Sequence, residues 1–285
     1  TKFTTSQTQC LMDLSSLIPL PDKEEEVRVA WRFPRVPKFV VIGAVVLPIF
    51  SFTLTYCLYF GLGHSHFAVR MLSDTINQLP ESQVGAFILG IANFFMGSTL
   101  FMRYYYVKHQ IKCLDHSSKN GEDGTNLNRV RKVNRRGLIL GWASVIGAHG
   151  VASFQESSAL PAHSLSAFVF FFGTWGYFVA HAWLDFHLVL ETRFLRRLRV
   201  VLCVGEFLCF TGMSCCMIIS ACNGHVRRDD PDALEWQFAA ALEVAAFLLF
   251  MLQLASWTPG FSTVQLDVGL SDIVLPNRRS VNPLQ

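Results

Sequence analysis

The stretch FVVIGAVVLPIFSFTLTYCLYFGL, residues 39–62, has no charged side chain. About 20 apolar residues at a rise of 1.5 Å span the ~30 Å hydrocarbon core of a bilayer. Because each backbone amide inside hydrocarbon must be hydrogen-bonded within its own segment, the stretch is expected to be helical. Pro48 is expected to kink this helix, which membrane helices tolerate. The stretch is therefore predicted to be the first membrane span.

Further apolar runs follow along the chain. They cover residues 84–102, 137–154, 164–184, 200–222 and 236–257. Composition agrees, because 51% of the residues are hydrophobic and only 16% are charged, against about 25% charged in average soluble chains. The sequence predicts an all-α fold, a polytopic membrane helix bundle of six transmembrane helices over residues 39–257, and excludes a soluble enzyme.

Small residues mark the second and third spans. They are Gly85, Gly90, Gly97, Gly137, Gly141, Gly147 and Gly150. Glycine lets membrane helices approach closely, so these positions are expected to lie at helix contacts.

The positive charges predict how the chain threads the membrane. All but Arg70, Arg227 and Arg228 of the 24 Lys and Arg residues fall in four segments. These segments are 1–38, 103–136, 193–199 and 278–279. An excess of Lys and Arg marks the cytoplasmic side. Residues 1–38 are therefore predicted to be a largely flexible cytosolic segment, and residues 258–285 a cytosolic tail.

The loop predicted at 103–136 is rich in Ser, Asn and Gly at its centre, a composition typical of flexible segments. It ends in RVRKVNRR (129–136), directly before the third span. The basic side chains either only determine the membrane topology or also bind anionic inner-leaflet lipids. Such binding contributes about 1 kcal/mol of binding free energy for each basic residue. They are Arg129, Arg131, Lys132, Arg135 and Arg136. This loop and the tails are also the segments predicted to contact cytosolic proteins.

The eight cysteines do not form a disulfide or metal framework. Most lie inside the run 200–222 without CxxC spacing, where they are expected to pack as small apolar side chains. Only Cys57 and Cys222, both near outer span ends, are candidates for a disulfide.

Three outer stretches are distinctive: LSDTINQLPES (72–82), VASFQESSALPAHSLSAFVF (151–170) and DALEWQFAAALEVAAF (232–247). In this order on a six-span frame they resemble the Frag/DRAM/Sfk family. That family includes the damage-regulated autophagy modulators, tentonin-type proteins and, more distantly, the N-terminal part of Cwh-type GPI-lipid remodelling proteins. The matching residues are Ser73, Asp74, Pro80, Glu81, Ser82, Arg103, Tyr104, Phe154, Gln155, Glu156, His163 and Glu243. The resemblance covers roughly residues 39–268 and departs at Val244, where relatives often have an aromatic residue.

The resemblance implies a multi-pass protein of the plasma membrane or of lysosomal and endosomal membranes, without catalytic activity. The leading prediction is a non-enzymatic regulator or scaffold in autophagy and lysosome function or in plasma-membrane lipid and phosphoinositide organisation. A channel or transporter component with a polar path near Glu243 and Asn93 is the alternative. A GPI-lipid remodelling factor using Asp74, Glu156 and His163 is a third. No cofactor, resident metal or nucleic acid is expected, and no Walker, HExxH or GxSxG motif is present.

Two acidic residues lie inside predicted spans. Glu243 lies about 10 Å below the outer end of the sixth span, and an unpaired carboxylate there costs several kcal/mol. It is expected to be protonated, paired or in a wet cavity, and His149 lies at a depth that allows contact. Glu206 is expected to extend towards Arg199 or Arg197. Either acid is a polar link between helices or part of a site for a headgroup, ion or proton.

Other acids and imidazoles lie in the outer loops. Asp74, Glu81 and Glu156, with His64, His66 and His163, suit a metal or headgroup. The favoured interpretation is structural. Ser73, Asp74 and Ser82 cap turns and helix starts, and Glu156 binds backbone amides.

Overall fold

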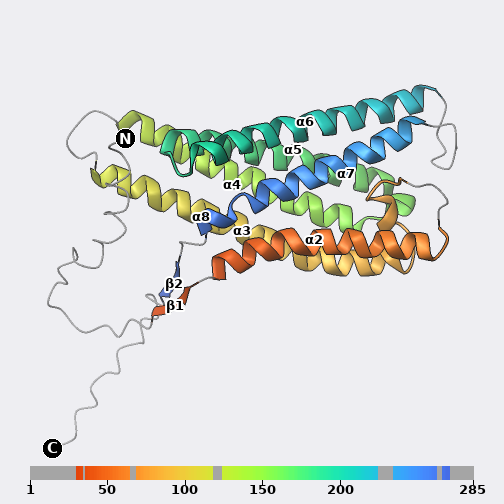
Figure 1. Cartoon of the computed structure of the whole chain (residues 1–285), viewed down its shortest axis with the longest axis horizontal. Helices are drawn as coiled ribbons and strands as arrows, with labels where there is room; N and C mark the ends of the chain where they lie inside the picture. The colour runs from red at the N-terminus through yellow and green to blue at the C-terminus, as the bar shows by residue number, and fades with distance from the viewer. Residues whose placement is uncertain are drawn as a thin grey trace, which may run out of the picture.

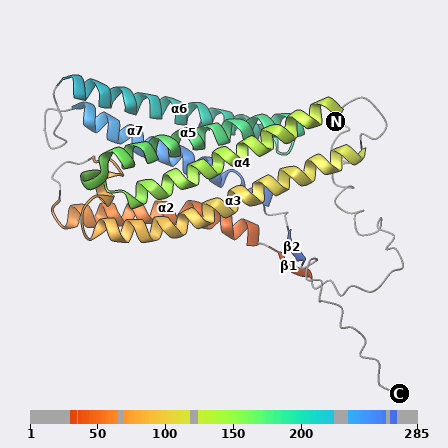
Figure 2. The same cartoon turned by 180° about the vertical axis from the view of Figure 1, so that it is seen from behind.

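The computed structural model describes residues 30–34, 36–64, 69–117, 124–223, 234–261 and 265–269. Within these residues six long helices run side by side in an elongated bundle (Figures 1 and 2). They are α2 (Val36–Gly61), α3 (Glu81–Ser117), α4 (Gly124–Ser153), α5 (Glu156–Leu188), α6 (Arg193–Cys222) and α7 (Leu234–Ala255). The short helix η2 (Asp74–Ile76) lies at one end of the bundle. The short helix α8 (Thr258–Phe261) follows α7 towards the other end, where α3 and α4 extend beyond it. These ends are called the η2 end and the sheet end below.

Of the described helices, five are long and apolar enough to cross a membrane: α2, α3, α5, α6 and α7 with α8, with mean hydropathy of 1.3 to 2.1. Helix α4 falls short because its first half carries the basic residues of 129–136, so only 137–153 is apolar. It nevertheless packs along both α3 and α5. The predicted all-α membrane bundle is confirmed, with α4 packed along two helices that meet the criterion alone.

The segment 103–136 is not the flexible loop that its composition predicted. Helix α3 continues to Ser117 and α4 begins at Gly124, while residues 118–123 lie outside the described part of the chain. The helical extensions bury a second apolar cluster against the end of α5. This cluster contains Val107, Ile111, Leu127, Val130, Leu184 and Leu188. Helices α3 and α4 thus extend beyond the predicted span ends because apolar side chains on these extensions pack against each other and against the end of α5.

The main core lies where the central parts of the long helices meet. Its large side chains include Tyr177, Phe178, Phe250 and Trp257, all at most 6% exposed. Close approach of α4 to α5 depends on Gly147, where an added Cβ would lie 2.4 Å from the Phe170 backbone nitrogen. The helix contact expected for this glycine is confirmed.

Cys57 and Cys222 both have free, exposed thiols, so the candidate disulfide between them is wrong. The reason is the order of packing. Helix α2 packs against α3 and α7, whereas α6 packs against α5 and α7.

A two-stranded antiparallel sheet joins the two ends of the membrane region. Strand β1 (Ala30–Pro34) pairs with β2 (Gln265–Gly269), with Arg32 opposite Asp267. The sequence analysis did not predict these strands, because each gains its hydrogen bonds from a segment far away in the sequence. The rest of the predicted tails, residues 1–29 and 270–285, lies outside the described residues.

Candidate functional site

The segment 69–80 folds over the η2 end of the bundle and is pinned to α2. The Thr55 and Thr75 hydroxyls are 3.1 Å apart, and the backbone N–H of Arg70 donates to the Tyr56 hydroxyl at 2.9 Å. The Asn77 side chain accepts from the Ser157 N–H at 2.9 Å, which ties the segment to the start of α5. This segment therefore forms a fixed cover over the helices.

Glu243 of α7 binds the cover from below. Its Oε2 accepts a hydrogen bond from the backbone N–H of Leu72 at 2.6 Å. A carboxylate is a strong acceptor for a backbone N–H that would otherwise be buried without a partner. The expected contact with His149 is not formed, because His149 points outward from α4 and is exposed. Glu243 is thus paired, as expected, but with the cover segment.

A cavity of about 90 Å³ lies beneath the cover, between the long helices. One water needs about 10–15 Å³ measured in this way, so the cavity has room for several waters or part of a lipid chain. Its walls are mainly apolar, with Phe52, Ile76 and Phe247 among them. The polar residues that reach it are Ser73, Asn93, His163, Glu206 and Glu243.

Glu206 lies in the cavity wall and is 3% exposed. Its carboxyl makes no hydrogen bond or ion pair with the described residues. The predicted extension towards Arg199 is wrong, because Arg199 is bound to Asp185 and Glu206 lies two helical turns further along α6. The Asn93 Nδ2 atom in the same wall is also buried and without a partner in the described part of the protein. The Glu206 carboxyl, an acceptor, and Asn93 Nδ2, a donor, thus both line the mainly apolar cavity without a hydrogen-bond partner among the described residues.

Most of the other predicted outer residues hold the cover and the helix starts. Glu81 is fully buried and pairs with the His64 ring at 2.6 Å. His163 Nδ1 lies 2.7 Å from the Phe154 carbonyl oxygen, which fixes the ring across the turn between α4 and α5. The Pro80 carbonyl accepts from the N–H groups that open α3. These residues support the cavity from the side of the cover.

The predicted capping roles are only partly visible. Ser73 and Gln155 stand at the N-caps of η2 and α5 without a side-chain capping bond. Ser82 Oγ is buried with no partner in the described residues. Asp74 is buried in η2, and Glu156 lies in the first turn of α5. Among the described residues no three His, Cys, Asp or Glu side chains could hold a metal ion, and His66 lies outside them.

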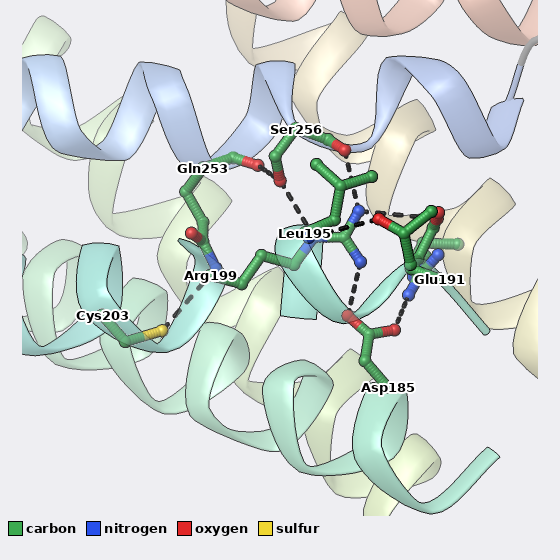
Figure 3. A network of polar contacts seen from close by, with 9 residues as sticks. Asp185, Glu191, Leu195, Arg199, Cys203, Gln253 and Ser256 are labelled. Carbon is green, nitrogen blue, oxygen red and sulfur yellow. Dashed lines mark hydrogen bonds and ion pairs between the residues drawn. The ribbon is translucent and has the colours of Figure 1, made fainter. Parts of the chain in front are cut away.

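A second polar group lies near the sheet end and ties four helices together (Figure 3). Arg103 of α3 and Arg199 of α6 donate to different oxygens of Asp185 on α5, the second at 2.5 Å. Arg199 also donates to the carbonyl and hydroxyl of Ser256, which directly follows α7, at 2.8 and 3.0 Å. Glu191 lies 3.5 Å from Arg199. The group is called the arginine network below.

Sequence reasoning identified Arg103 and missed Asp185. The missed signal was a lone Asp one residue after the predicted end of the fourth span at 184. Tyr104, predicted beside Arg103, accepts from Asn134 Nδ2 through its carbonyl at 3.1 Å and so joins α3 to α4. Between the network and the cavity the bundle interior is filled by Tyr177, Phe178 and Trp257.

The basic cluster lies on the first half of α4, beyond the apolar part of the helix. All five of its predicted lipid-contacting residues are exposed. Two have partners within the chain: Arg129 lies over the Trp183 ring at 5.3 Å, and Arg131 pairs with Asp115 at 2.7 Å. Lys132, Arg135 and Arg136 form the remaining basic face, which is called the α4 basic face below.

Comparison with known proteins places this architecture in a family. Residues 37–264 match the model of the Frag1/DRAM/Sfk1/Cwh43P N-terminal domain. The chain is also similar to DNA damage-regulated autophagy modulator protein 2 from Bos taurus and Homo sapiens, at 28% identity over 141 residues, and from Rattus norvegicus at 29%. The match covers 50% of this chain and 48% of each relative, so the chain spans about half the length of the curated relatives it matches.

No solved structure matches the chain. The family model covers most of the chain, including the cover segment, the turn between α4 and α5, the arginine network and Glu243. The protein is a multi-pass membrane protein that belongs to the Frag1/DRAM/Sfk1/Cwh43P N-terminal domain family.

Proposed function

We propose that the protein is a non-enzymatic membrane regulator or scaffold in autophagy and lysosome function or in plasma-membrane lipid and phosphoinositide organisation. The relatives it matches are named as modulators of autophagy. It acts in the plasma membrane or in lysosomal and endosomal membranes, with both chain ends in the cytosol. There it binds anionic inner-leaflet lipids and recruits cytosolic proteins through the helical extensions of α3 and α4 and through its tails.

The α4 basic face is the observation that carries this proposal. Lys132, Arg135 and Arg136 are exposed and directly precede the apolar half of α4. With the sheet end in the cytosol, they reach the headgroups of the inner leaflet. Each basic residue near an anionic surface contributes about 1 kcal/mol, so three together strengthen binding roughly 100-fold.

The test replaces Lys132, Arg135 and Arg136 with Gln in the full chain, held in neutral nanodiscs. Binding to vesicles containing phosphatidylserine should weaken by roughly 100-fold. The control is Arg131→Gln, which removes a charge already paired with Asp115 and should have a much smaller effect. Equal binding by the triple variant and the parent protein would overturn the lipid contact.

The regulatory part is tested in cells. Expression of the full chain should change autophagic flux during starvation, and the triple variant should lose that change while reaching the same membrane. An unchanged flux with correctly inserted protein would contradict a role in autophagy.

A channel or transporter component is the second candidate, because Glu243 and Asn93 both line the cavity as a polar path requires. Against it, Tyr177, Phe178 and Trp257 fill the interior between cavity and sheet end, and the arginine network lies behind them. Ion or solute flux in liposomes that is lost with Glu243→Ala would favour this candidate. GPI-lipid remodelling is the third, and it has less support because His163 Nδ1 is already bound to the Phe154 carbonyl.

A further inference from the structure

Three adjoining spaces follow the seam between α5 and α6. A groove of about 320 Å³ is lined by these two helices alone, and a constriction of about 10 Å³ follows it. Trp175 and Phe207 line both the groove and the constriction. Phe171 and Glu206 line both the constriction and the cavity beneath the cover. The groove, the constriction and the cavity therefore adjoin one another in that order.

The groove opens sideways from the bundle. Val179, Phe186, Val200 and Val204 line it and are exposed. Both helices are long and apolar enough to span a membrane. Side chains that are exposed on such helices face hydrocarbon rather than water. The molecule available to fill the groove is accordingly a membrane lipid.

The constriction is closed by aromatic side chains. Phe171 stacks against Phe210 with centroids 4.8 Å apart, and Trp175 against Phe207 at 4.9 Å. One side of each pair belongs to α5 and the other to α6, and no hydrogen bond crosses these pairs. Rotation of the rings widens the passage without breaking any polar contact.

The cavity end of these three spaces is polar. Glu206 offers an unsatisfied acceptor and Asn93 Nδ2 an unsatisfied donor, both buried in the cavity wall. Leaving such groups unpaired is costly. A charged headgroup is too costly to bring to this depth, whereas a hydroxyl is uncharged and both donates and accepts. The chemistry fits an uncharged lipid with a small hydroxyl headgroup.

We propose that the α5–α6 seam is a lateral entrance for such a lipid. Its hydroxyl binds Glu206 and Asn93 in the cavity, and its apolar body lies in the groove. Sterols and diacylglycerols share this chemistry. The site does not include Lys132, Arg135 or Arg136, so it stands independently of the regulatory role proposed above.

The experiment uses the full chain in phosphatidylcholine nanodiscs that contain a photoreactive sterol or a photoreactive diacylglycerol. After irradiation, the crosslinked peptides should map to 175–186 and 200–207, and excess unlabelled lipid of the same kind should compete. The stronger of the two labels identifies the source of the hydroxyl. The proposal would be overturned if a photoreactive phosphatidylcholine labelled the same peptides equally and neither unlabelled lipid competed. That result would mean that the groove contacts the surrounding bilayer lipids without selecting among them.

Two variants test the parts of the site. Glu206→Leu removes the acceptor and should reduce competed labelling about tenfold. Val204→Trp fills the groove from its exposed rim and should abolish labelling there. Val201→Trp, on the same helix and exposed but outside the groove, is the matched control and should label like the parent protein.

Thermal unfolding of each variant in detergent verifies that it is folded. Labelling of a folded Glu206→Leu protein at the parent level would overturn the polar end of the site. Unchanged labelling of Val204→Trp would overturn the groove. Vesicle binding by the α4 basic face should be the same in all three variants, which separates this test from that of the regulatory role.

Discussion

Arg103 and Arg199 lie inside the bundle with side chains 1% and 0% exposed, and both donate to Asp185. An ion buried in a low-dielectric interior costs several kcal/mol unless an opposite charge and hydrogen bonds compensate it. Asp185 supplies that charge to two helices at once, while Ser256 accepts two further hydrogen bonds from Arg199. The sheet end of the bundle therefore depends on one carboxylate more than on any arginine.

Replacing Asp185 with Asn keeps the side-chain shape but leaves both arginines without their shared counter-charge. The free energy of unfolding should fall by about 3–5 kcal/mol, measured by denaturant or thermal unfolding in detergent. Asp115→Asn is the control, because its ion pair with Arg131 has both side chains about half exposed. Such pairs contribute at most about 1 kcal/mol. Similar losses in the two variants would contradict the account of the arginine network.

The sequence located Arg103 and Glu243 but neither of their partners. Asp185 follows the predicted span end by one residue, where hydropathy gives no reason to place it inside. Glu206 was assigned a partner wrongly, since the direction of a side chain depends on how the helix packs. Long-range pairs such as Glu243 with Leu72 cannot be read from spacing at all.

Helices α4 and α5 approach more closely than ordinary side chains allow. An added Cβ at Gly147 would meet the Phe170 nitrogen at 2.4 Å and the Ser166 carbonyl oxygen at 2.7 Å. These are backbone atoms, so they move only if the helices separate. Gly90 of α3 was also expected to lie at a helix contact, but an added Cβ there would have no atom within 4 Å. Close packing therefore does not require glycine at this position.

Gly147→Ala should therefore lower the free energy of unfolding by about 1–3 kcal/mol, as overpacking does. Gly90→Ala should be neutral or raise it by up to about 1 kcal/mol, because alanine favours helix where space is open. Unfolding of both variants under one detergent condition compares them directly. A stabilising Gly147→Ala substitution would show that the two helices are not in close contact.

Sequence reasoning predicted the positions of the helices well and their lengths poorly. A span predicted from hydropathy ends where charged residues begin, as the second span does before Arg103. Helix α3 nevertheless continues to Ser117. The continuation depends on Val107 and Ile111 packing against the end of α5. That packing is tertiary, so composition alone favoured a loop.

Six long helices and the paired strands place both ends of the membrane region at the same end of the bundle (Figure 1). The orientation predicted from Lys and Arg makes that end cytosolic. The even number of membrane helices could be predicted from the sequence. The β1–β2 pairing could not, because the two strands come from opposite ends of the chain.

Epitope tags at the two chain ends should accordingly both be digested by protease added to cells with a permeabilised plasma membrane. A tag inserted between α6 and α7, after Asn223, should be protected until detergent is added if the protein is in lysosomal or endosomal membranes. If it is in the plasma membrane, this tag should be digested in intact cells, where the terminal tags are protected. Digestion of one terminal tag and protection of the other would contradict the six-helix topology.

The arginine network also has a consequence for biogenesis. Asp185 is synthesised 82 residues after Arg103, which corresponds to roughly 4–16 s at typical elongation rates. During that interval Arg103 has no counter-ion and its long side chain extends to the headgroups. Withdrawal of this cation from the interface, once α5 and α6 have emerged from the translocon, completes insertion. A nascent chain that lacks Asp185 is expected to keep the Arg103 charge at the interface, because the ion pair of Arg103 is with Asp185.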